Sequence, residues 1–188
     1  MIGTFIANMV TIPGDSPVFE SPKEYNLKFK EVTFRAADGV ELSGWIINPG
    51  KDKVIIQQHF AGQCSRTGYT PKGKRGIKLW DKDISFLRQA KYLADEGYTV
   101  LMYDFRNHGL SNQGTVKYVT GGVEEYKDVI AAVDFISKHQ YYKNANIGLF
   151  SICMGTNSTS LAFGVEGGLE NYKNVKAYVS VQPLNFGN

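Results

Sequence analysis

The chain has 188 residues, of which 43% are hydrophobic and 21% charged, and its formal net charge is +3. These values are typical of a folded protein with one domain and exclude a disordered chain. The charge is too small to indicate nucleic-acid binding, and no apolar run reaches the roughly 20 residues of a membrane span. The two cysteines and three histidines do not form a metal-ligand cluster or a disulfide framework. We therefore expect no metal or other cofactor, and a cytoplasmic setting.

Residues 1–26 are predicted to form an irregular N-terminal segment, which is rich in proline. The single domain is predicted to occupy 27–188. Two alternating runs, 27–36 and 40–48, lie on either side of an Asp-Gly turn and predict a β-hairpin. The apolar run at 53–60 predicts a strand that is buried on both faces.

A glycine- and lysine-rich loop is expected over 61–78, and its basic run 71–78 is interpreted as a solvated loop rather than a phosphate site. The apolar spacing over 83–97 predicts a helix. Asp83 is the expected N-cap of this helix and Gly97 its C-terminal stop.

The rest of the chain alternates between strand and helix patterns. The predicted elements are a strand at 98–105, a helix at 121–139, a strand at 146–153, a helix at 154–163 and a strand at 175–184. The apolar face predicted for the helix at 121–139 consists of Val123, Tyr126, Ile130, Val133 and Ile136. This order predicts an α/β fold: a hairpin, then a mainly parallel, doubly wound sheet with helices on both faces. Right-handed crossovers would bring the carboxyl ends of the parallel strands to one edge.

One cysteine lies where a predicted strand turns into a predicted helix. The stretch "FSICMG" (150–155) places small residues, Ser151 and Gly155, two positions on either side of Cys153. A nucleophile elbow requires this pattern, because bulk at either position would clash with neighbouring backbone. The adjacent helix N-terminus should lower the pKa of the thiol. The alternative is a buried structural cysteine.

A second loop follows the strand at 53–60 and reads "HFAGQCS". Its backbone N–H at Ala61, together with that of Met154, could bind a developing oxyanion beside Cys153. In the alternative interpretation, His59 simply bonds to neighbouring backbone.

A third loop, "YDFRNHGLS" (103–111), carries Asp104, Arg106 and His108. These side chains could act in catalysis. More often such a cluster braces a loop through ion pairs and hydrogen bonds, and we favour that interpretation.

The order of these motifs, "VIIQQHFAG…YDFRNHGLS…IGLFSICMG", resembles the N-terminal two-thirds of an α/β-hydrolase. The similarity is to the branch of serine aminopeptidases, X-prolyl peptidase-like hydrolases and dienelactone hydrolase-like esterases. The resemblance implies that Cys153 is the nucleophile and that Met154 and Ala61 provide the oxyanion hole. It also implies that the 103–111 loop, with Asp104 and His108, is mainly structural.

The sequence departs from the family pattern at several positions. Ser151 replaces the first elbow glycine, and Cys153 replaces the usual serine, as in dienelactone hydrolase-like members. Phe60 replaces the glycine that follows the oxyanion-loop histidine. Asn107 also replaces a glycine, and asparagine tolerates the positive φ that a glycine would supply.

The largest departure concerns the acid and base of the triad. In the family both follow the elbow, whereas His59, His108 and His139 all precede Cys153. We expect the triad acid and base to lie outside these residues, in a longer polypeptide. Either that polypeptide or another chain would complete the sheet beyond the strand at 175–184, which would otherwise be a bare edge.

The expected function is therefore hydrolysis of an ester, thioester, lactone or amide through an acyl-enzyme on Cys153. The partner would be a small-molecule or peptide acyl substrate. If these residues acted alone, His108 is the histidine to consider as base. The alternative is an inactive hydrolase-fold protein that binds a small ligand or a protein partner.

Overall fold

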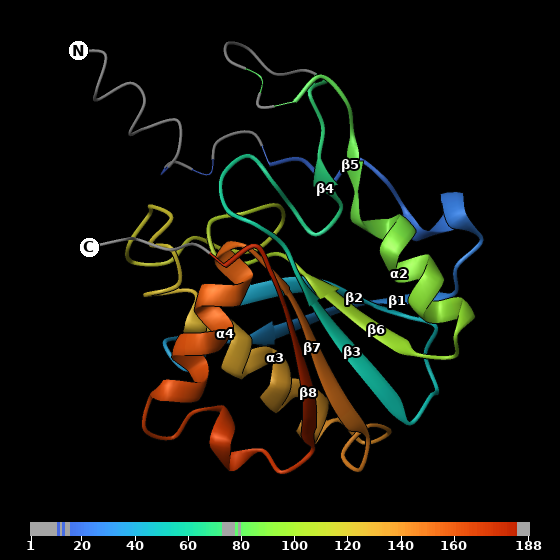
Figure 1. Ribbon diagram of the computed structural model, residues 1–188, viewed down its shortest axis with the longest axis vertical. Helices are drawn as coiled ribbons and strands as arrows, with labels where there is room; N and C mark the ends of the chain where they lie inside the picture. Colours follow the sequence, from blue (N-terminus) through green and yellow to red (C-terminus); the bar gives the residue numbers. More distant parts are fainter. Residues whose placement is uncertain (1–10, 12, 14–15, 73–77, 79, 184–188) are drawn as a thin grey trace.

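The computed structural model describes residues 11, 13, 16–72, 78 and 80–183 (Figure 1). Its main sheet contains β1 (Phe29–Arg35), β2 (Glu41–Ile47), β3 (Lys53–Gln58), β6 (Thr99–Tyr103), β7 (Asn146–Ile152) and β8 (Val175–Val181), in the order β1-β2-β6-β3-β7-β8. A two-stranded sheet pairs β4 (Gly68–Tyr69) with β5 (Ile84–Ser85). The helices are η1 (Pro22–Tyr25), α2 (Phe86–Asp95), α3 (Tyr126–Lys138), α4 (Met154–Gly164) and η2 (Leu169–Asn171).

The predicted hairpin is confirmed. β1 and β2 pair antiparallel from Phe29↔Ile47 to Arg35↔Glu41. The turn between them places Gly39 at φ 86°, a left-handed conformation that glycine adopts without steric cost. β2 is also antiparallel to β6, while β6, β3, β7 and β8 run parallel to one another. The fold class is thus the predicted α/β class, a mainly parallel sheet with an N-terminal hairpin.

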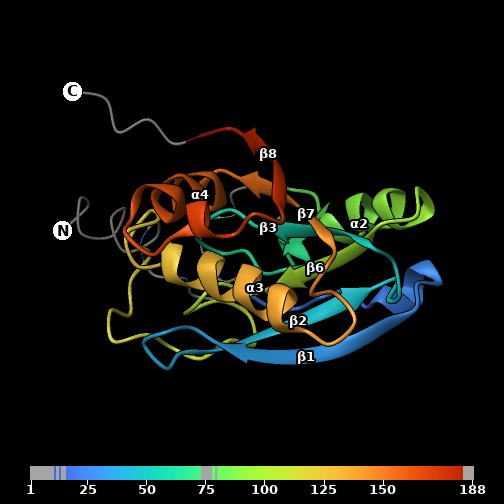
Figure 2. The same cartoon turned by 90° about the horizontal axis from the view of Figure 1, so that it is seen from below.

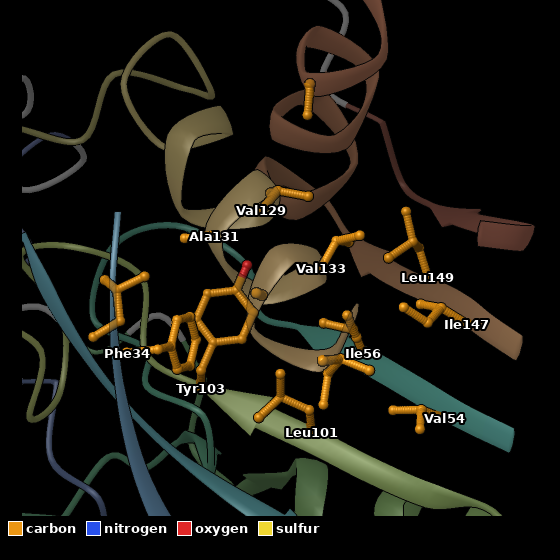
Figure 3. Close-up of a cluster of buried hydrophobic side chains, with 14 of the residues drawn as sticks. Phe34, Val54, Ile56, Leu101, Tyr103, Val129, Ala131, Val133, Ile147 and Leu149 are labelled. Atoms are coloured by element: carbon orange, nitrogen blue, oxygen red, sulfur yellow. The ribbon is translucent and has the colours of Figure 1, made fainter. Parts of the chain in front are cut away.

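The two faces of the sheet are covered by different helices, which form two layers around it (Figure 2). Side chains alternate along a strand, so Leu101 of β6 packs with α3 and α4 while Met102 packs with α2. Figure 3 shows the hydrophobic core between the sheet and α3, in which Val129 and Val133 of α3 cover the strands. Because both faces are buried, the central strands are apolar almost throughout.

The strand order reverses direction at β3. The chain leaves β3, crosses through α2 to β6 on one side, and then returns through α3 to β7 on the other. In open α/β sheets, ligands bind outside the carboxyl ends of the strands at such a reversal. β3 and β7 are paired up to Gln58↔Ser151, so the segments that follow them begin side by side.

The helix predicted over 83–97 begins later than expected. Asp83 is not its N-cap: its carboxylate accepts a hydrogen bond from Thr70 Oγ1 at 2.7 Å and pairs with Lys72 at 3.2 Å. Ser85 is the residue that precedes the helix. The predicted stop is confirmed, since Gly97 follows the last turn at φ 85° and its N–H donates to Ala94 O.

Two further expectations need correction. Val123 does not belong to the buried face of the third helix, because α3 begins at Tyr126 and Val123 is 61% exposed. The segment predicted as a loop over 61–78 contains a short strand, and residues 64–70 are all buried. Two of these residues form β4, which pairs with β5 just before α2. Most of the basic run, 73–77, lies outside the described residues.

β8 is the last strand of the sheet in the described part of the chain. Its outward-facing positions are open to solvent, and Val179 is 52% exposed. The expectation that another segment or chain pairs with this strand stays a prediction.

Arg106 joins three parts of the fold beside the end of β6. Its guanidinium donates to Asp128 of α3 at 2.7 and 2.9 Å and to Asp38 of the hairpin turn at 2.7 Å. Burial by itself would lower the pKa of Arg106, but the hydrogen bonds to Asp128 and Asp38 outweigh burial and raise it. The side chains of Arg106 and Asp128 are 1% and 0% exposed, so this is a buried pair.

Removal of one partner of this buried pair should therefore be costly. Asp128→Ala is expected to lower the free energy of unfolding by about 3 kcal/mol, because Arg106 keeps its charge in a buried site. Asp95→Ala removes the exposed partner of Lys91 and should cost no more than about 1 kcal/mol. Urea denaturation of both variants tests this, and equal losses would contradict the role assigned to the Arg106 pair.

Candidate active site

Cys153 stands between β7 and α4 in a strained conformation. β7 ends at Ile152 and α4 begins at Met154, and the residue between them has φ 54° and ψ −109°. A residue with a side chain rarely adopts such angles, which cost about 1–3 kcal/mol. The turn is held because Cys153 N–H donates to Val181 O at 2.8 Å and Cys153 O accepts from Thr156 N–H at 2.9 Å. These are the dihedrals and the position that an elbow requires.

The small residues on either side of this turn are explained by close packing. A Cβ on Gly155 would lie 2.9 Å from Gln58 Cβ and 3.2 Å from His59 O, both at the end of β3. Ser151 is fully buried, and its hydroxyl lies 3.0 Å from that of Thr159 on α4. A larger residue at either position would push α4 away from the sheet.

Burial and two backbone N–H groups act in opposite directions on the pKa of the Cys153 thiol. Burial raises the pKa of this thiol, and hydrogen bonding from the N–H of Met154 and then of Ala61 lowers it, with burial prevailing. The prediction of a lowered pKa is therefore wrong, because partial burial removes more hydration from the thiolate than the helix end replaces. Ala61 follows β3 and Met154 follows β7, and because these strands are paired neighbours, both residues lie at the same end of the sheet.

His59 is buried, and both of its ring nitrogens are engaged by backbone. Nε2 accepts the N–H of Phe105 at 3.1 Å, and Nδ1 lies 2.7 Å from Phe60 O. Since Nε2 accepts, the proton of the neutral ring is on Nδ1, which donates to the carbonyl. Burial lowers the pKa of His59 to about 4; the bond to Phe60 raises it and the charge of Arg66 lowers it further.

Asp104 is fully buried and is held by Arg66, a residue that sequence analysis did not single out. The Asp104 carboxylate accepts from Arg66 N at 2.6 Å, from its Nε and Nη2 at 3.1 and 2.8 Å, and from Leu110 N at 2.8 Å. The Arg66 guanidinium also lies 4.7 Å from the Trp45 ring centroid. A lone arginine in a polar loop carries no sequence signal for this role, because its partner is 38 residues away.

His108 lies beside His59, with ring centroids 5.0 Å apart. Its Nδ1 donates to Arg106 O at 2.8 Å, and its Nε2 has no hydrogen-bond partner among the described residues. Burial, followed by the neighbouring His59, lowers the pKa of His108 to about 4. The turn before it has Asn107 at φ 65°, so asparagine does adopt the positive φ expected of it. Asp104, Arg106 and His108 thus make the internal contacts of a braced loop.

The structure brings together Cys153, Met154 and Ala61, which sequence analysis grouped as nucleophile and oxyanion hole. No histidine follows Cys153 in the sequence, and Glu166 and Glu170, the acids that do, are exposed. His59 has no free nitrogen with which to accept a proton.

Two aromatic rings pack against Phe60, the residue that follows His59. Phe60 packs against Trp80 and Phe86 at centroid distances of 5.5 and 5.6 Å. The ring of Tyr69 lies 5.0 Å from that of Trp80, by centroids, and Tyr69 is fully buried whereas Trp80 is 46% exposed.

A cavity of about 690 Å³ opens elsewhere, between the hairpin turn, α3 and the segment after α4. Several of its charged groups pair with one another: Lys127 contacts Asp38 and Lys138 contacts Asp134, which also accepts a hydrogen bond from the hydroxyl of Tyr172. Its lining includes none of the residues around Cys153, so the cavity is separate from the candidate site.

The described part of the chain contains no helix long and apolar enough to cross a bilayer. In the same residues, no group of three or more His, Cys, Asp or Glu side chains is placed to hold a metal ion.

Comparison with known proteins identifies similar structures but no sequence family. No family model and no curated protein matches the chain. The Pyrococcus furiosus esterase Pf2001 superposes with a TM-score of 0.70 at 28% identity, over 92% of this chain and 58% of the esterase. The α/β hydrolase GrgF from Penicillium sp. sh18 gives a TM-score of 0.57 at 23% identity, over 84% and 46% of the two chains.

A dienelactone hydrolase from Anabaena variabilis superposes with a TM-score of 0.56 at 18% identity, over 82% of this chain and 62% of that chain. At this identity the likeness concerns the fold alone. The chain therefore has the α/β-hydrolase fold, and it spans little more than half the length of the esterase.

The packing at Gly155 can be tested with a matched glycine on the same helix. Gly155→Ala should lower the free energy of unfolding by about 1–3 kcal/mol, because the methyl group meets the end of β3. Gly164→Ala, where no atom lies within 4 Å of the new Cβ, should be neutral or stabilising by up to about 1 kcal/mol. The measurement is urea denaturation, and a neutral Gly155→Ala would contradict the close contact.

The buried histidines should make the fold sensitive to acid. Both have a native pKa of about 4, against 6.5 for a free side chain, so below pH 6.5 the unfolded state binds more protons than the native state. Each should therefore cost about 2 kcal/mol of stability when the pH falls from 7 to 5.

His108→Asn, in which the amide replaces the Nδ1 donor, should remove about half of this histidine-dependent loss. Unfolding free energies of the parent and the variant at the two pH values provide the measurement. An unchanged pH dependence in the variant would show that His108 is not a buried neutral histidine.

Proposed function

We propose that this chain carries the nucleophile and oxyanion hole of a hydrolase that cleaves an ester, thioester, lactone or amide through an acyl-enzyme. The observation that supports this most directly is the strained elbow at Cys153, where hydrogen bonding from the N–H groups of Met154 and Ala61 lowers the pKa of the thiol. Two preorganised donors beside a nucleophile are what a tetrahedral oxyanion requires. The likeness to the esterase Pf2001 adds to this argument.

In the proposed reaction, the thiolate of Cys153 attacks the carbonyl carbon of the acyl substrate and forms a C–S bond. The carbonyl electron pair moves to oxygen, and the resulting oxyanion accepts hydrogen bonds from the N–H groups of Ala61 and Met154. The carbonyl then reforms, and the leaving group departs with the electron pair of its bond to carbon. Water hydrolyses the thioester that remains and regenerates the thiol.

The raised pKa of Cys153 defines what else the reaction requires. At neutral pH little of the thiol is ionised, so efficient attack needs a base to remove its proton. We propose that this base and its acid partner come from outside these 188 residues, consistent with a chain that spans 58% of the esterase it resembles.

A second candidate function is a hydrolase-fold protein that binds a small ligand or a protein partner without chemistry. The raised thiol pKa is the observation in its favour, since a catalytic cysteine more often has a lowered pKa.

Reaction with p-nitrophenyl acetate distinguishes the two functions, because its leaving group needs no proton. The chain should release about one equivalent of p-nitrophenolate and gain one acetyl group on Cys153, at a rate that rises with pH as the thiolate forms. Mass spectrometry of the digested protein locates the acetyl group. Cys153→Ala should abolish the release.

Cys64→Ala serves as the control, because Cys64 is fully buried and its loss should leave the release intact. Acetylation of the parent at the same rate as the Cys153→Ala variant would end the proposal that Cys153 is the nucleophile, and would favour the binding protein.

A further inference from the structure

We propose that His59 is a positioning residue, which sets the orientation of the oxyanion-hole N–H at Ala61 by donating a hydrogen bond to the carbonyl of the same peptide unit. This inference rests on the proposed function, in which that N–H binds the oxyanion.

The geometry of one peptide unit carries the inference. Nδ1–H of His59 donates to Phe60 O at 2.7 Å. The carbonyl oxygen of Phe60 and the amide nitrogen of Ala61 belong to the same peptide bond, whose atoms lie in one plane with C=O and N–H pointing in opposite directions. A hydrogen bond that holds the oxygen therefore also fixes the direction of the Ala61 N–H, which follows β3 where that strand pairs with β7 and lowers the pKa of the Cys153 thiol.

The proton that makes this bond is itself held in place. Phe105 N–H donates to Nε2 of His59 at 3.1 Å, so Nε2 keeps its lone pair and Nδ1 keeps the proton. Phe105 lies just beyond β6, and the next residue, Arg106, is anchored to Asp128 by its backbone N–H as well as by its guanidinium. The tautomer of His59 is thus fixed by a part of the chain that is itself rigidly held.

The ring and backbone of His59 have little room to move. The ring lies 5.1 Å from the Phe105 ring and 5.0 Å from the His108 ring, by centroids. The carbonyl of His59 would lie 3.2 Å from a Cβ on Gly155, so the residue also abuts the first turn of α4. Its position relative to the elbow is consequently fixed from both sides.

A donor on the carbonyl does more than orient the peptide. Hydrogen bonds in a chain polarise one another, so donation to Phe60 O makes the Ala61 N–H a stronger donor to an oxyanion. Phe60 and Ala61 are partly buried, so fewer water molecules compete for these hydrogen bonds. A histidine that only satisfied its own burial would give the same stability without affecting the reaction.

Two amide substitutions separate the two nitrogens of His59. The shorter amide of His59→Asn would place an NH₂ group near the position of Nδ1, so this variant keeps a donor to Phe60 O and loses the acceptor for Phe105. The longer amide of His59→Gln would lie near Nε2, so this variant keeps the acceptor and loses the donor. Both variants are expected to be destabilised, but only His59→Gln loses the contact to the oxyanion peptide.

The measured quantity is the ratio of the rates of two reactions of the Cys153 thiolate, acetylation and alkylation. Acetylation by p-nitrophenyl acetate passes through an oxyanion, whereas alkylation by iodoacetamide displaces iodide and forms none. Both rates are measured for Cys153 over a range of pH and extrapolated to the fully ionised thiol, which removes any change in thiol pKa. We expect the ratio of acetylation to alkylation to fall about tenfold in His59→Gln, less than the 10²–10³ lost when a donor is deleted, and to change less than about threefold in His59→Asn.

Val133→Ala, which loses buried core packing in the middle of α3, provides a variant of lowered stability whose ratio should not change. Equal ratios in the two His59 variants would overturn the inference, whether both ratios match that of the parent protein or both fall together. If the parent protein shows no acetylation of Cys153, the proposed function itself fails, and this outcome is distinct from the others. Protection of Cys64 from iodoacetamide reports whether each variant is folded.

Discussion

The candidate site depends on the parallel pairing of β3 with β7. This pairing ends at Gln58↔Ser151, and β7 continues by one residue, Ile152, so the segments that follow the two strands leave the same end of the sheet side by side. The contact is close because Gly155 has no side chain, and the end of β3 occupies the space that a Cβ would need. The register of β3 and β7 therefore places Cys153, which follows β7, at the same end of the sheet as Ala61, which follows β3. The two residues are 92 positions apart in the sequence.

Two buried ion pairs hold the surrounding loops in relation to this point. Asp104 with Arg66 joins the segment after β6 to the segment after β3, and Arg106 with Asp128 joins the same segment to α3. Each charge is surrounded by several donors or acceptors, which is the condition under which burial of a charge is tolerated. The loops around Cys153 are therefore part of the rigid body of the domain, although they carry no regular secondary structure over most of their length.

The alternation of strands and helices was predictable from the sequence because each element has a regular apolar period, and the elbow was predictable because small residues at fixed spacing are a local requirement. Contacts over long separations were not predictable. The partner of Asp104 is an arginine in another loop, and the start of α2 is displaced from Asp83 because that carboxylate binds Thr70. The thiol pKa was misjudged for a related reason: the helix end is a local feature, whereas the burial that outweighs it comes from the whole fold.

The raised pKa of Cys153 also affects how readily this thiol is oxidised. Thiolates, and not thiols, react with peroxides and disulfides. A cysteine that is half-buried and largely protonated at neutral pH is therefore slow to oxidise, even though its backbone is already arranged for attack. Burial at the elbow would therefore keep the sulfur protonated and slow to oxidise until a base removes its proton for reaction with a substrate. The desolvation that disfavours the thiolate would thus also protect Cys153 from oxidation between catalytic cycles.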